Sequence, residues 1–271
     1  MRTKIDVHEL YEEYVFGKQT LRQLSVKHGI SVSSIQRTLK SAQSECMVSS
    51  KKKVVVLMDT TYWGWNFGVV VMKDWRTGKI LWRKFINKKE TLSDYKEGEE
   101  WLLSHDFRID GIVCDGLRGM FQMFAEYRMQ MCQFHQIKIV KRYLTNAPKL
   151  PAAIELWNIV KLMCHTDKES FMATFNQWSE DWGDFLKERT TDAKTGKTHY
   201  AHRRLSSAYL SLKRNMPHLW TFYDYSVAGI PNTNNALEGQ FTDLKTKLRN
   251  HNGLSIRQRK KFIDMYFMRK Y

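Results

Sequence analysis

Cysteine and proline are scarce in this chain, which has four of each among its 271 residues. The cysteines lie far apart, at Cys46, Cys114, Cys132 and Cys164. This spacing excludes a small disulfide-stabilised scaffold and is typical of proteins from a reducing compartment. Long apolar runs are also missing: the longest, such as 54–58 and 67–72, are about one strand long and cannot span a bilayer. The first residues lack the apolar segment of a signal peptide, so we expect a cytoplasmic protein.

Acidic residues are few relative to basic ones, with 28 Asp and Glu against 44 Lys and Arg and a formal net charge of +16. So large a positive charge favours a polyanionic partner, of which nucleic-acid phosphate is the commonest. A ribosomal or merely basic protein would have the same charge, and the charge alone does not separate these classes. Hydrophobic residues make up 42% and aromatic residues 13% of the chain, which is enough for a globular protein with a sizeable core.

Residues 1–45 carry the spacing of three short helices, and we expect a helix-turn-helix DNA-binding domain there. Gly17 ends the first helix and Ser31 opens the third. Thr20 is the expected N-cap of the second helix, which Gly29 closes. An ordinary helical hairpin has the same pattern, but the polar face of the third helix favours DNA binding because its side chains suit base edges and phosphates. The candidate DNA-binding residues are Ser33, Ser34, Gln36, Arg37 and Lys40.

A polar, basic linker is expected at 46–53, and strand-like segments begin after it. Three of these segments are joined by short turns, as in an antiparallel meander. A helix, a buried strand, a second helix, a further strand and a third helix come next. The expected strands are 52–63, 65–74, 79–86, 109–116 and 129–134, and the expected helices are 92–106, 117–127 and 135–145. The order βββαβαβα over 54–150 predicts an α/β fold with a mixed sheet flanked by helices.

Residues 151–230 show helical spacing without a competing strand pattern, so we expect an all-helical insertion with a loop at 190–199. Residues 231–271 then form a polar Asn-rich loop, a helix and a basic C-terminal helix. The first of these two helices has a packing face made of Leu237, Phe241, Leu244 and Leu248. A second stripe, one residue further on, is made of Glu238, Thr242, Lys245 and Arg249. The carboxylate of this stripe could be a metal ligand and its two cations could contact phosphates. Alternatively, the stripe could be a solvated helix face with an ordinary charge pair.

Basic residues of the last segment extend the positive surface, and the lysines at 51–53 add to it. These residues of the last segment are Arg257, Arg259, Lys260, Lys261, Arg269 and Lys270.

Three acidic residues stand out by their positions. Asp59 ends the first expected strand, Asp115 ends the fourth, and Glu238 lies one turn into the helix after the Asn-rich loop. A carboxylate directly after a buried run is costly unless it is paired or bound to a metal. If the first and fourth strands are neighbours, Asp59 and Asp115 emerge side by side, and a divalent cation would neutralise their repulsion. The alternative for either Asp alone is a cap on the next helix or turn.

Cys132 and His135 have the Cys-x-x-His spacing of half a zinc site, and Cys164 with His165 could complete a set of four ligands. Half-motifs of this kind are weak evidence for zinc, and two adjacent residues would chelate a metal awkwardly. We therefore expect no zinc and assign Cys132 and His135 a structural or substrate-facing role.

Taken together, these segments resemble the DDE transposases of the Mutator-like superfamily, in its bacterial insertion-sequence branch. The resemblance covers residues 54–267. It is carried by LMDTTYW around Asp59, VCDGLRGMF around Asp115, CQFHQIKIVKRYLT, and PNTNNALEGQFTDLKTKLRNHNGLS around Glu238. The Cys-x-x-His after the second Asp and the Asn-rich loop before the Glu are peculiar to that group. Relatives of this kind often run longer at the N-terminus, some with a zinc-binding segment ahead of the helix-turn-helix.

The resemblance implies an RNase H-like fold in which Asp59, Asp115 and Glu238 are catalytic. It also implies that these three residues hold two Mg²⁺ ions, with Mn²⁺ as a substitute. The ions would activate a water or a DNA 3′-hydroxyl and stabilise the leaving 3′-oxygen. The same centre would then cleave the transposon end and join it to target DNA, since both steps are in-line phosphoryl transfers.

Substrate binding falls, by the same resemblance, to a further set of residues: His135, Cys132, Asn234, Asn235, Lys245 and Arg249. Turn formation and helix capping are the alternative roles for the asparagines of this loop, including Asn232. In the N-terminal helices, Gln36 and Arg37 are the candidates for reading bases and Lys40 for binding phosphate.

The expected partners are terminal inverted repeats and target DNA, bound by a homodimer or a higher oligomer, with no membrane partner. The expected location is the nucleoid of a bacterial or archaeal cytoplasm. Two alternatives remain open at this point. One is a truncated or domesticated DNA-binding protein without catalytic activity, and the other is an RNase H-like nuclease that cuts DNA without joining it.

Overall fold

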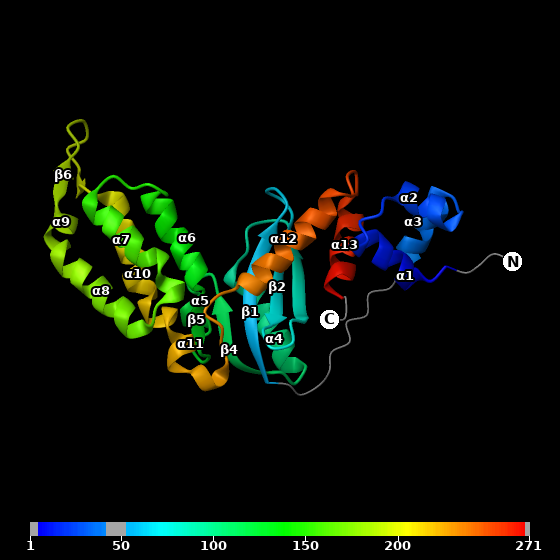
Figure 1. The fold of residues 1–271 in the computed structure, drawn as a ribbon, viewed down its shortest axis with the longest axis horizontal. Coiled ribbons are helices and arrows are strands. Elements are labelled where there is room, and N and C mark those ends of the chain that lie inside the picture. The colour runs from blue at the N-terminus through cyan, green and yellow to red at the C-terminus, as the bar shows by residue number, and fades with distance from the viewer. Residues whose placement is uncertain (1–4, 42–52, 269–271) are drawn as a thin grey trace. The chain divides into compact units, whose positions relative to one another are not determined.

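The computed structural model describes residues 5–41 and 53–268, and Figure 1 shows their helices and strands. The expected linker at 46–53 lies outside the described residues except for Lys53, and so do Cys46, Arg269 and Lys270. Backbone contacts divide the chain into two compact units. The first unit comprises 1–52, 60–107 and 236–271, and the second comprises 53–59 and 108–235.

The N-terminal helices belong to the first unit and follow the sequence prediction closely. They are α1 (Val7–Tyr11), a π-helical turn (Glu12–Phe16), α2 (Leu21–His28) and α3 (Val32–Ser41). Thr20 and Gln23 form a capping box at the start of α2, and Gly29 ends α2 with a φ of 61°. Both signals were read correctly from the sequence, because capping side chains and left-handed glycines act locally. The π-helical turn was not predicted.

A mixed five-stranded sheet is present, as the sequence order βββαβαβα predicts, and its strand order is β3-β2-β1-β4-β5. The strands are β1 (Lys53–Tyr62), β2 (Gly68–Asp74), β3 (Ile80–Ile86), β4 (Arg108–Cys114) and β5 (Met129–Met131). β2 and β3 are antiparallel, whereas β4 runs parallel to both β1 and β5. All seven residues of β2 are buried, as expected for a strand covered on both faces.

Two helices connect these strands, α4 (Leu92–Ser104) between β3 and β4 and α5 (Met120–Met123) between β4 and β5, and α6 (Gln133–Leu144) follows β5. α5 is much shorter than the predicted helix at 117–127, because Gly119 precedes it with a φ of 91° and the chain leaves helical geometry at Phe124. α6 starts at Gln133, two residues earlier than predicted, so the expected strand at 129–134 is correspondingly shorter.

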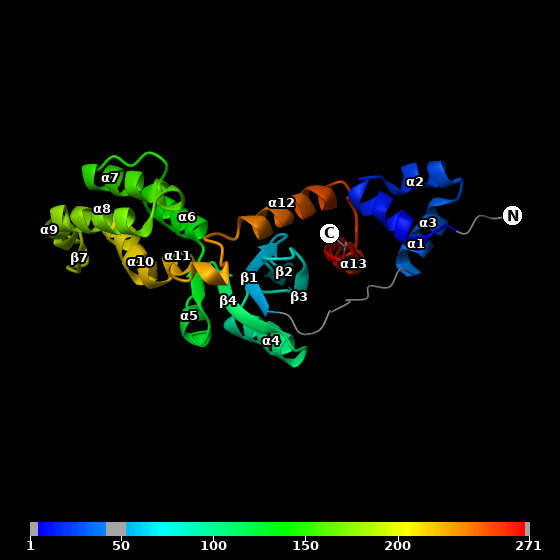
Figure 2. The same cartoon turned by 60° about the horizontal axis from the view of Figure 1, so that its bottom comes forward.

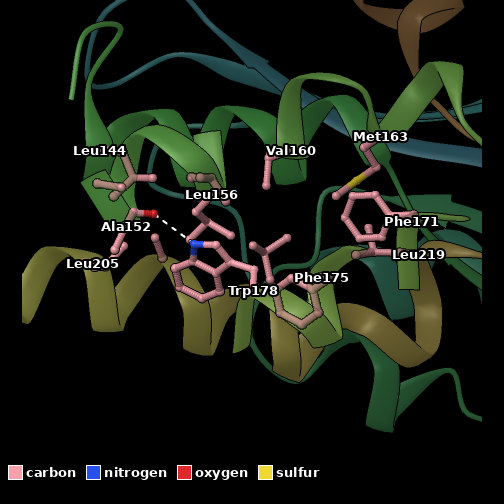
Figure 3. Close-up of a cluster of buried hydrophobic side chains, with 14 of the residues drawn as sticks. Leu144, Ala152, Leu156, Val160, Met163, Phe171, Phe175, Trp178, Leu205 and Leu219 are labelled. Carbon is pink, nitrogen blue, oxygen red and sulfur yellow. Dashed lines mark hydrogen bonds between the residues drawn. The ribbon is translucent and has the colours of Figure 1, made fainter. Parts of the chain in front are cut away.

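The second unit contains a block of helices built around a hydrophobic cluster. The helices are α7 (Pro151–Lys161), α8 (Lys168–Asp181), α9 (Gly183–Lys187), α10 (Arg203–Leu219) and α11 (Thr221–Asp224). α6 lies against α7 and α10, and α7 lies against α8 (Figures 1 and 2). Figure 3 shows the cluster between them, where the indole of Trp178 donates a hydrogen bond of 3.0 Å to the backbone oxygen of Ala152.

The prediction of an all-helical insertion is wrong over residues 189–200. This segment forms an antiparallel hairpin of β6 (Arg189–Thr191) and β7 (Thr198–Tyr200). Asp192 shapes the turn by accepting hydrogen bonds from the backbone of Lys194 and Thr195. The sequence shows no apolar alternation because the hairpin covers no core, and a strand without a buried face has no periodicity to detect.

The last two helices, α12 (Asn235–Arg249) and α13 (Ile256–Phe267), belong to the first unit. The predicted packing face of α12 is confirmed, since its four members are all buried: Leu237, Phe241, Leu244 and Leu248. The N-terminal helices pack on these helices through Tyr14, whose ring lies 4.2 Å from His251 and 5.9 Å from Phe262. None of the described helices combines the length and apolar character needed to cross a bilayer.

Candidate functional site

Asp59 lies inside β1, as the expected strand at 52–63 implies, and it ends the apolar run of that strand and not the strand itself. The strand continues for three residues through Thr60, Thr61 and Tyr62, whose β-branched and aromatic side chains favour extended backbone. The side chain of Asp59 is largely buried, with the residue 7% exposed. A carboxylate this deeply buried needs hydrogen bonds or a cation to remain charged.

Asp115 directly follows β4, as predicted, and is half-buried. Its carboxylate accepts a hydrogen bond of 3.2 Å from the backbone of Leu117, which is the local capping role that the sequence left open. Gly116 has a φ of 78°, and a Cβ there would lie 2.5 Å from the sulfur of Met131. The left-handed backbone therefore favours glycine immediately after Asp115, and any other residue would also displace the end of the Met131 side chain.

The register of β1 against β4 brings Asp59 and Asp115 to neighbouring positions. Leu57 is paired with Val113 in this parallel ladder, and Asp59 and Asp115 each follow that pair by two residues. Opposite residues of neighbouring strands point to the same face of a sheet. The condition set by the sequence, that the first and fourth strands be neighbours, is met.

The pKa of the Cys114 thiol depends on its burial and on neighbouring charges. Burial raises its pKa far above the ordinary value, and the charges of Asp115, Cys132 and Asp59 add to the increase. Cys132 is held beside Cys114 because its backbone donates a hydrogen bond of 2.8 Å to the backbone oxygen of Cys114.

His135 faces Asp59 from the first turn of α6. A ring nitrogen of His135 and a carboxylate oxygen of Asp59 lie within 4.8 Å of each other, and both residues belong to the second unit. Sequence analysis selected His135 only through the resemblance. The structure places His135 beside Asp59, the first acid of the motif.

The Asn-rich loop is anchored to the same place by Asn234. Its side-chain amide donates a hydrogen bond of 3.0 Å to the backbone oxygen of Met58, and its backbone donates one of 3.2 Å to the Sγ of Cys132. Asn234 and Cys132 are both fully buried, so Cys132 has the structural role that was one of its two expected roles. The Oδ1 of Asn234 is buried without a hydrogen-bond partner among the described residues.

The other two asparagines of this loop occupy ordinary loop and helix positions. Asn232 accepts a hydrogen bond of 3.0 Å from the backbone of Gln133, and its side chain donates one of 3.1 Å to the Oε1 of Gln133. Asn235 is the first residue of α12 and is exposed. Turn formation, the alternative role for Asn232, fits these contacts.

A buried polar network that the sequence did not reveal fixes α6 against α10. Gln136 donates a hydrogen bond of 3.2 Å to Ser211 and accepts one of 2.7 Å from Asn215. Gln133 donates one of 3.1 Å to the backbone oxygen of Leu219. The partners are 75 to 86 residues apart in the sequence, so no local pattern could have identified them. This network holds the helix that carries His135.

Glu238 lies in the first turn of α12, as predicted, and belongs to the first unit. Lys73 of β2 holds this turn in place. Its ammonium group donates a hydrogen bond of 3.1 Å to the backbone oxygen of Ala236 and one of 2.9 Å to the side chain of Gln240. Burial lowers the pKa of Lys73. Sequence analysis missed Lys73, although a lysine that directly follows a run as apolar as Gly68–Met72 is a signal of a buried, partnered cation.

The basic stripe of α12 continues from Glu238 in the direction of the C-terminus. Lys245 is half-buried and Arg249 is exposed. Lys247 lies on another side of the helix and forms an ion pair with Asp243, which also accepts a hydrogen bond of 2.8 Å from Tyr266. Of the two lysines of α12, Lys247 therefore supports the contact with α13, and Lys245 belongs to the predicted stripe.

The candidate DNA-binding residues of α3 differ in their exposure to solvent. Ser33, Arg37 and Lys40 are exposed, whereas Gln36 is half-buried. Ser34 forms a hydrogen bond of 2.9 Å with the hydroxyl of Ser31 at the start of the helix. A pocket between α3 and α13 is lined in part by Gln36, Lys40, Gln258 and Lys261.

In the comparisons with known proteins, no family model and no curated protein matches this chain. The donor set is therefore the basis for assigning chemistry to the site. Carboxylate oxygens are the ligands that Mg²⁺ prefers, and Asp59 with Asp115 supplies them from neighbouring strands. The unpartnered Oδ1 of Asn234, next to the strand that carries Asp59, fits a site that holds hydrated cations or water.

Proposed function

We propose that this protein is a DDE transposase of a bacterial insertion sequence, which cleaves DNA 3′ ends and joins them to target DNA in a metal-dependent reaction. The observation that carries the proposal is the pair of carboxylates on two neighbouring parallel strands, Asp59 within β1 and Asp115 directly after the end of β4. Structural capping does not need two such acids side by side, since their mutual repulsion is unfavourable without a cation. The proposal includes an RNase H-like character for the mixed sheet.

In this proposal, Asp59, Asp115 and Glu238 are the three catalytic acids and hold two Mg²⁺ ions. Bound Mg²⁺ would supply Lewis-acid stabilisation of the phosphoryl oxygens and an activated nucleophile. His135 would contact the phosphate beside Asp59, because its ring already faces that carboxylate. Asn234 would keep the Glu238 loop attached to β1 through its hydrogen bond to Met58. Lys73 would fix the first turn of α12 and thereby the position of Glu238.

DNA binding would use two basic surfaces and the N-terminal helices. The α1–α3 segment would act as a helix-turn-helix on the terminal inverted repeats, with Arg37 and Gln36 reading bases and Lys40 on phosphate. Lys245 and Arg249 would bind the DNA backbone along α12, and the basic residues of α13 would extend this surface. Joining two ends to one target would require at least a dimer on the DNA.

Strand transfer is the experiment that tests this function. Purified protein is mixed with labelled DNA carrying the end of the flanking element and a supercoiled plasmid, with Mg²⁺, with Mn²⁺ or with EDTA. We expect a joined product that requires metal and disappears in Asp115→Asn. Asp184→Asn, which removes a fully exposed carboxylate on α9, is the matched control and should retain full activity.

Two other outcomes would replace the proposal. Binding of DNA ends without cleavage or joining, in conditions where a related transposase works, would favour a domesticated or truncated DNA-binding protein. Metal-dependent cleavage without joined product would favour an RNase H-like nuclease.

A further inference from the structure

Trp65 is the most exposed large hydrophobic residue among the described ones, with 94% of its surface accessible. It lies at the tip of the loop 63–67, between β1 and β2. This loop is well ordered by its own contacts. The backbone of Trp63 donates a hydrogen bond of 2.8 Å to the backbone oxygen of Phe67, and the rings of these two residues lie 5.4 Å apart. Trp65 therefore projects from a fixed base.

An indole exposed so fully offers the flat faces of its ring to a partner. The immediate neighbours of Trp65, Gly64 and Asn66, are also exposed and are not apolar. The aromatic rings of Trp63 and Phe67 are turned into the base of the loop, where Phe67 stacks on Phe85 at 5.9 Å. Trp65 is thus a single flat apolar ring in polar surroundings, which differs from the contiguous apolar patch of a protein interface.

Two lysines accompany this ring. β3 ends at Ile86, which is paired with Gly68 directly after the loop. The chain then continues through Lys88 and Lys89, both exposed. It returns to the strand that precedes the loop, because the backbone of Glu90 donates a hydrogen bond of 2.8 Å to the hydroxyl of Tyr62. The lysines therefore lie on the same edge of the first unit as Trp65.

We propose that Trp65, Lys88 and Lys89 form a binding site for an unpaired nucleotide of DNA. The base stacks on the indole of Trp65, and the adjacent phosphates contact the two lysines. An isolated aromatic ring with neighbouring cations is the combination that single-stranded nucleic acids use, because every base has a flat face and every nucleotide a negative phosphate. That the nucleic acid is DNA rests on the proposed function. The loop directly follows β1, the strand that carries Asp59. The proposed site therefore suits a nucleotide next to a cleaved end.

The test measures binding of the full chain to two DNAs in EDTA, so that no chemistry takes place. One DNA is a blunt duplex, and the other is the same duplex with a short 3′ overhang containing 2-aminopurine. We expect Trp65→Ala to lose about tenfold in affinity for the overhang DNA, from the stacking contribution of one base. It should bind the blunt duplex as the wild type does. The fluorescence of 2-aminopurine should be quenched by the wild type and by Trp65→Phe, but not by Trp65→Ala.

Trp75→Ala is the matched control, because Trp75 is 40% exposed in the turn at the other end of β2. It should bind both DNAs as the wild type does. A double variant, Lys88→Ala with Lys89→Ala, should reduce the salt dependence of overhang binding by about 1.4, from about 0.7 for each phosphate that a lysine no longer neutralises.

Equal affinities of Trp65→Ala and the wild type for the overhang DNA would overturn the proposal. Loss of self-association in Trp65→Ala, with unchanged DNA binding, would assign the ring to a contact between copies of the chain instead. The result is independent of the strand-transfer assay. A protein that stacks the base but joins no DNA would contradict the proposed function alone.

Discussion

At the scale of single residues, buried polar groups determine how this fold is held together. Lys73 is 8% exposed and bridges two groups of α12, Ala236 and Gln240, that are 163 and 167 residues away in the sequence. Removing one partner from such a pair leaves the other buried and unsatisfied, at a cost of about 1–3 kcal/mol. Asn234 has the same character, because its amide joins the loop before α12 to the backbone of Met58. Both residues connect a candidate acid to a distant strand.

His251 gives a pH-dependent prediction at this scale. Its ring is buried against Tyr14 and Phe262, and burial lowers its pKa, although a hydrogen bond to the backbone of Tyr14 opposes the shift. Below the ordinary histidine pKa of about 6.5, the unfolded chain gains a proton that the folded chain does not. Stability should therefore be complete above that pH and decrease as the pH falls.

Thermal unfolding of the wild type and of His251→Phe, at about pH 7.5 and about pH 5.5, checks this expectation. Phenylalanine keeps an aromatic ring between Tyr14 and Phe262 but cannot take up a proton. The loss of melting temperature on acidification should be smaller in the variant. Identical losses in both proteins would show that His251 does not contribute to the acid response.

At the scale of helices and strands, the sequence predicts what repeats locally and misses what does not. The packing face of α12 was predicted because its leucines and phenylalanine recur with the helical period. The N-cap of α2 at Thr20 was predicted because a capping side chain acts within one helical turn, whereas its capping-box partner Gln23 was not predicted. The hairpin of β6 and β7 was missed because all but one of its strand residues are exposed and no buried face marks it. The bounds of β1 were predicted to within one residue, and Asp59 ends its apolar run while Thr60–Tyr62 extend the strand beyond it.

The candidate site follows the same rule. The sequence identified Asp59 and Asp115 as a pair only on the condition that the first and fourth strands are neighbours, because the strand that precedes β4 in the chain is β3, which lies at the other edge of the sheet. The roles of Lys73, Gln136 and Asn215 were not predictable, because each depends on a partner in a distant element. A single sequence carries no information on such pairs beyond an unexpected polar residue in an apolar run.

The basic stripe of α12 gives a prediction for an element. Lys245→Ala and Arg249→Ala should weaken binding to all DNA sequences alike, because phosphate contacts carry no sequence information. Each substitution should reduce the salt dependence of duplex binding by about 0.9. Binding titrations at several salt concentrations, on terminal-repeat DNA and on unrelated DNA, provide the measurement. Lys187→Ala is the control, since Lys187 is an exposed lysine of α9 whose side chain is 78% accessible. A loss confined to terminal-repeat DNA would contradict this role of α12.

At the scale of the whole molecule, the proposal assigns its three acids to different units. Asp59 and Asp115 belong to one unit, and Glu238 belongs to the other. A metal bound by all three acids would stabilise the folded chain through linkage, by about 2.7 kcal/mol at a concentration one hundred times the dissociation constant. That stabilisation corresponds to a rise in melting temperature of roughly 5–10 °C for a chain of this size class.

Thermal unfolding with Mg²⁺ and with EDTA separates the contributions of the two units. The wild type and Asp184→Asn should gain stability from Mg²⁺, because the exposed carboxylate of Asp184 takes no part in the site. Asp115→Asn and Glu238→Gln should each lose most of the gain, since a shared metal needs ligands from both units. If Glu238→Gln kept the full gain while Asp115→Asn lost it, the metal would be bound by the second unit alone. Glu238 would then have to act on DNA without holding the ion, and the three-acid proposal would not stand.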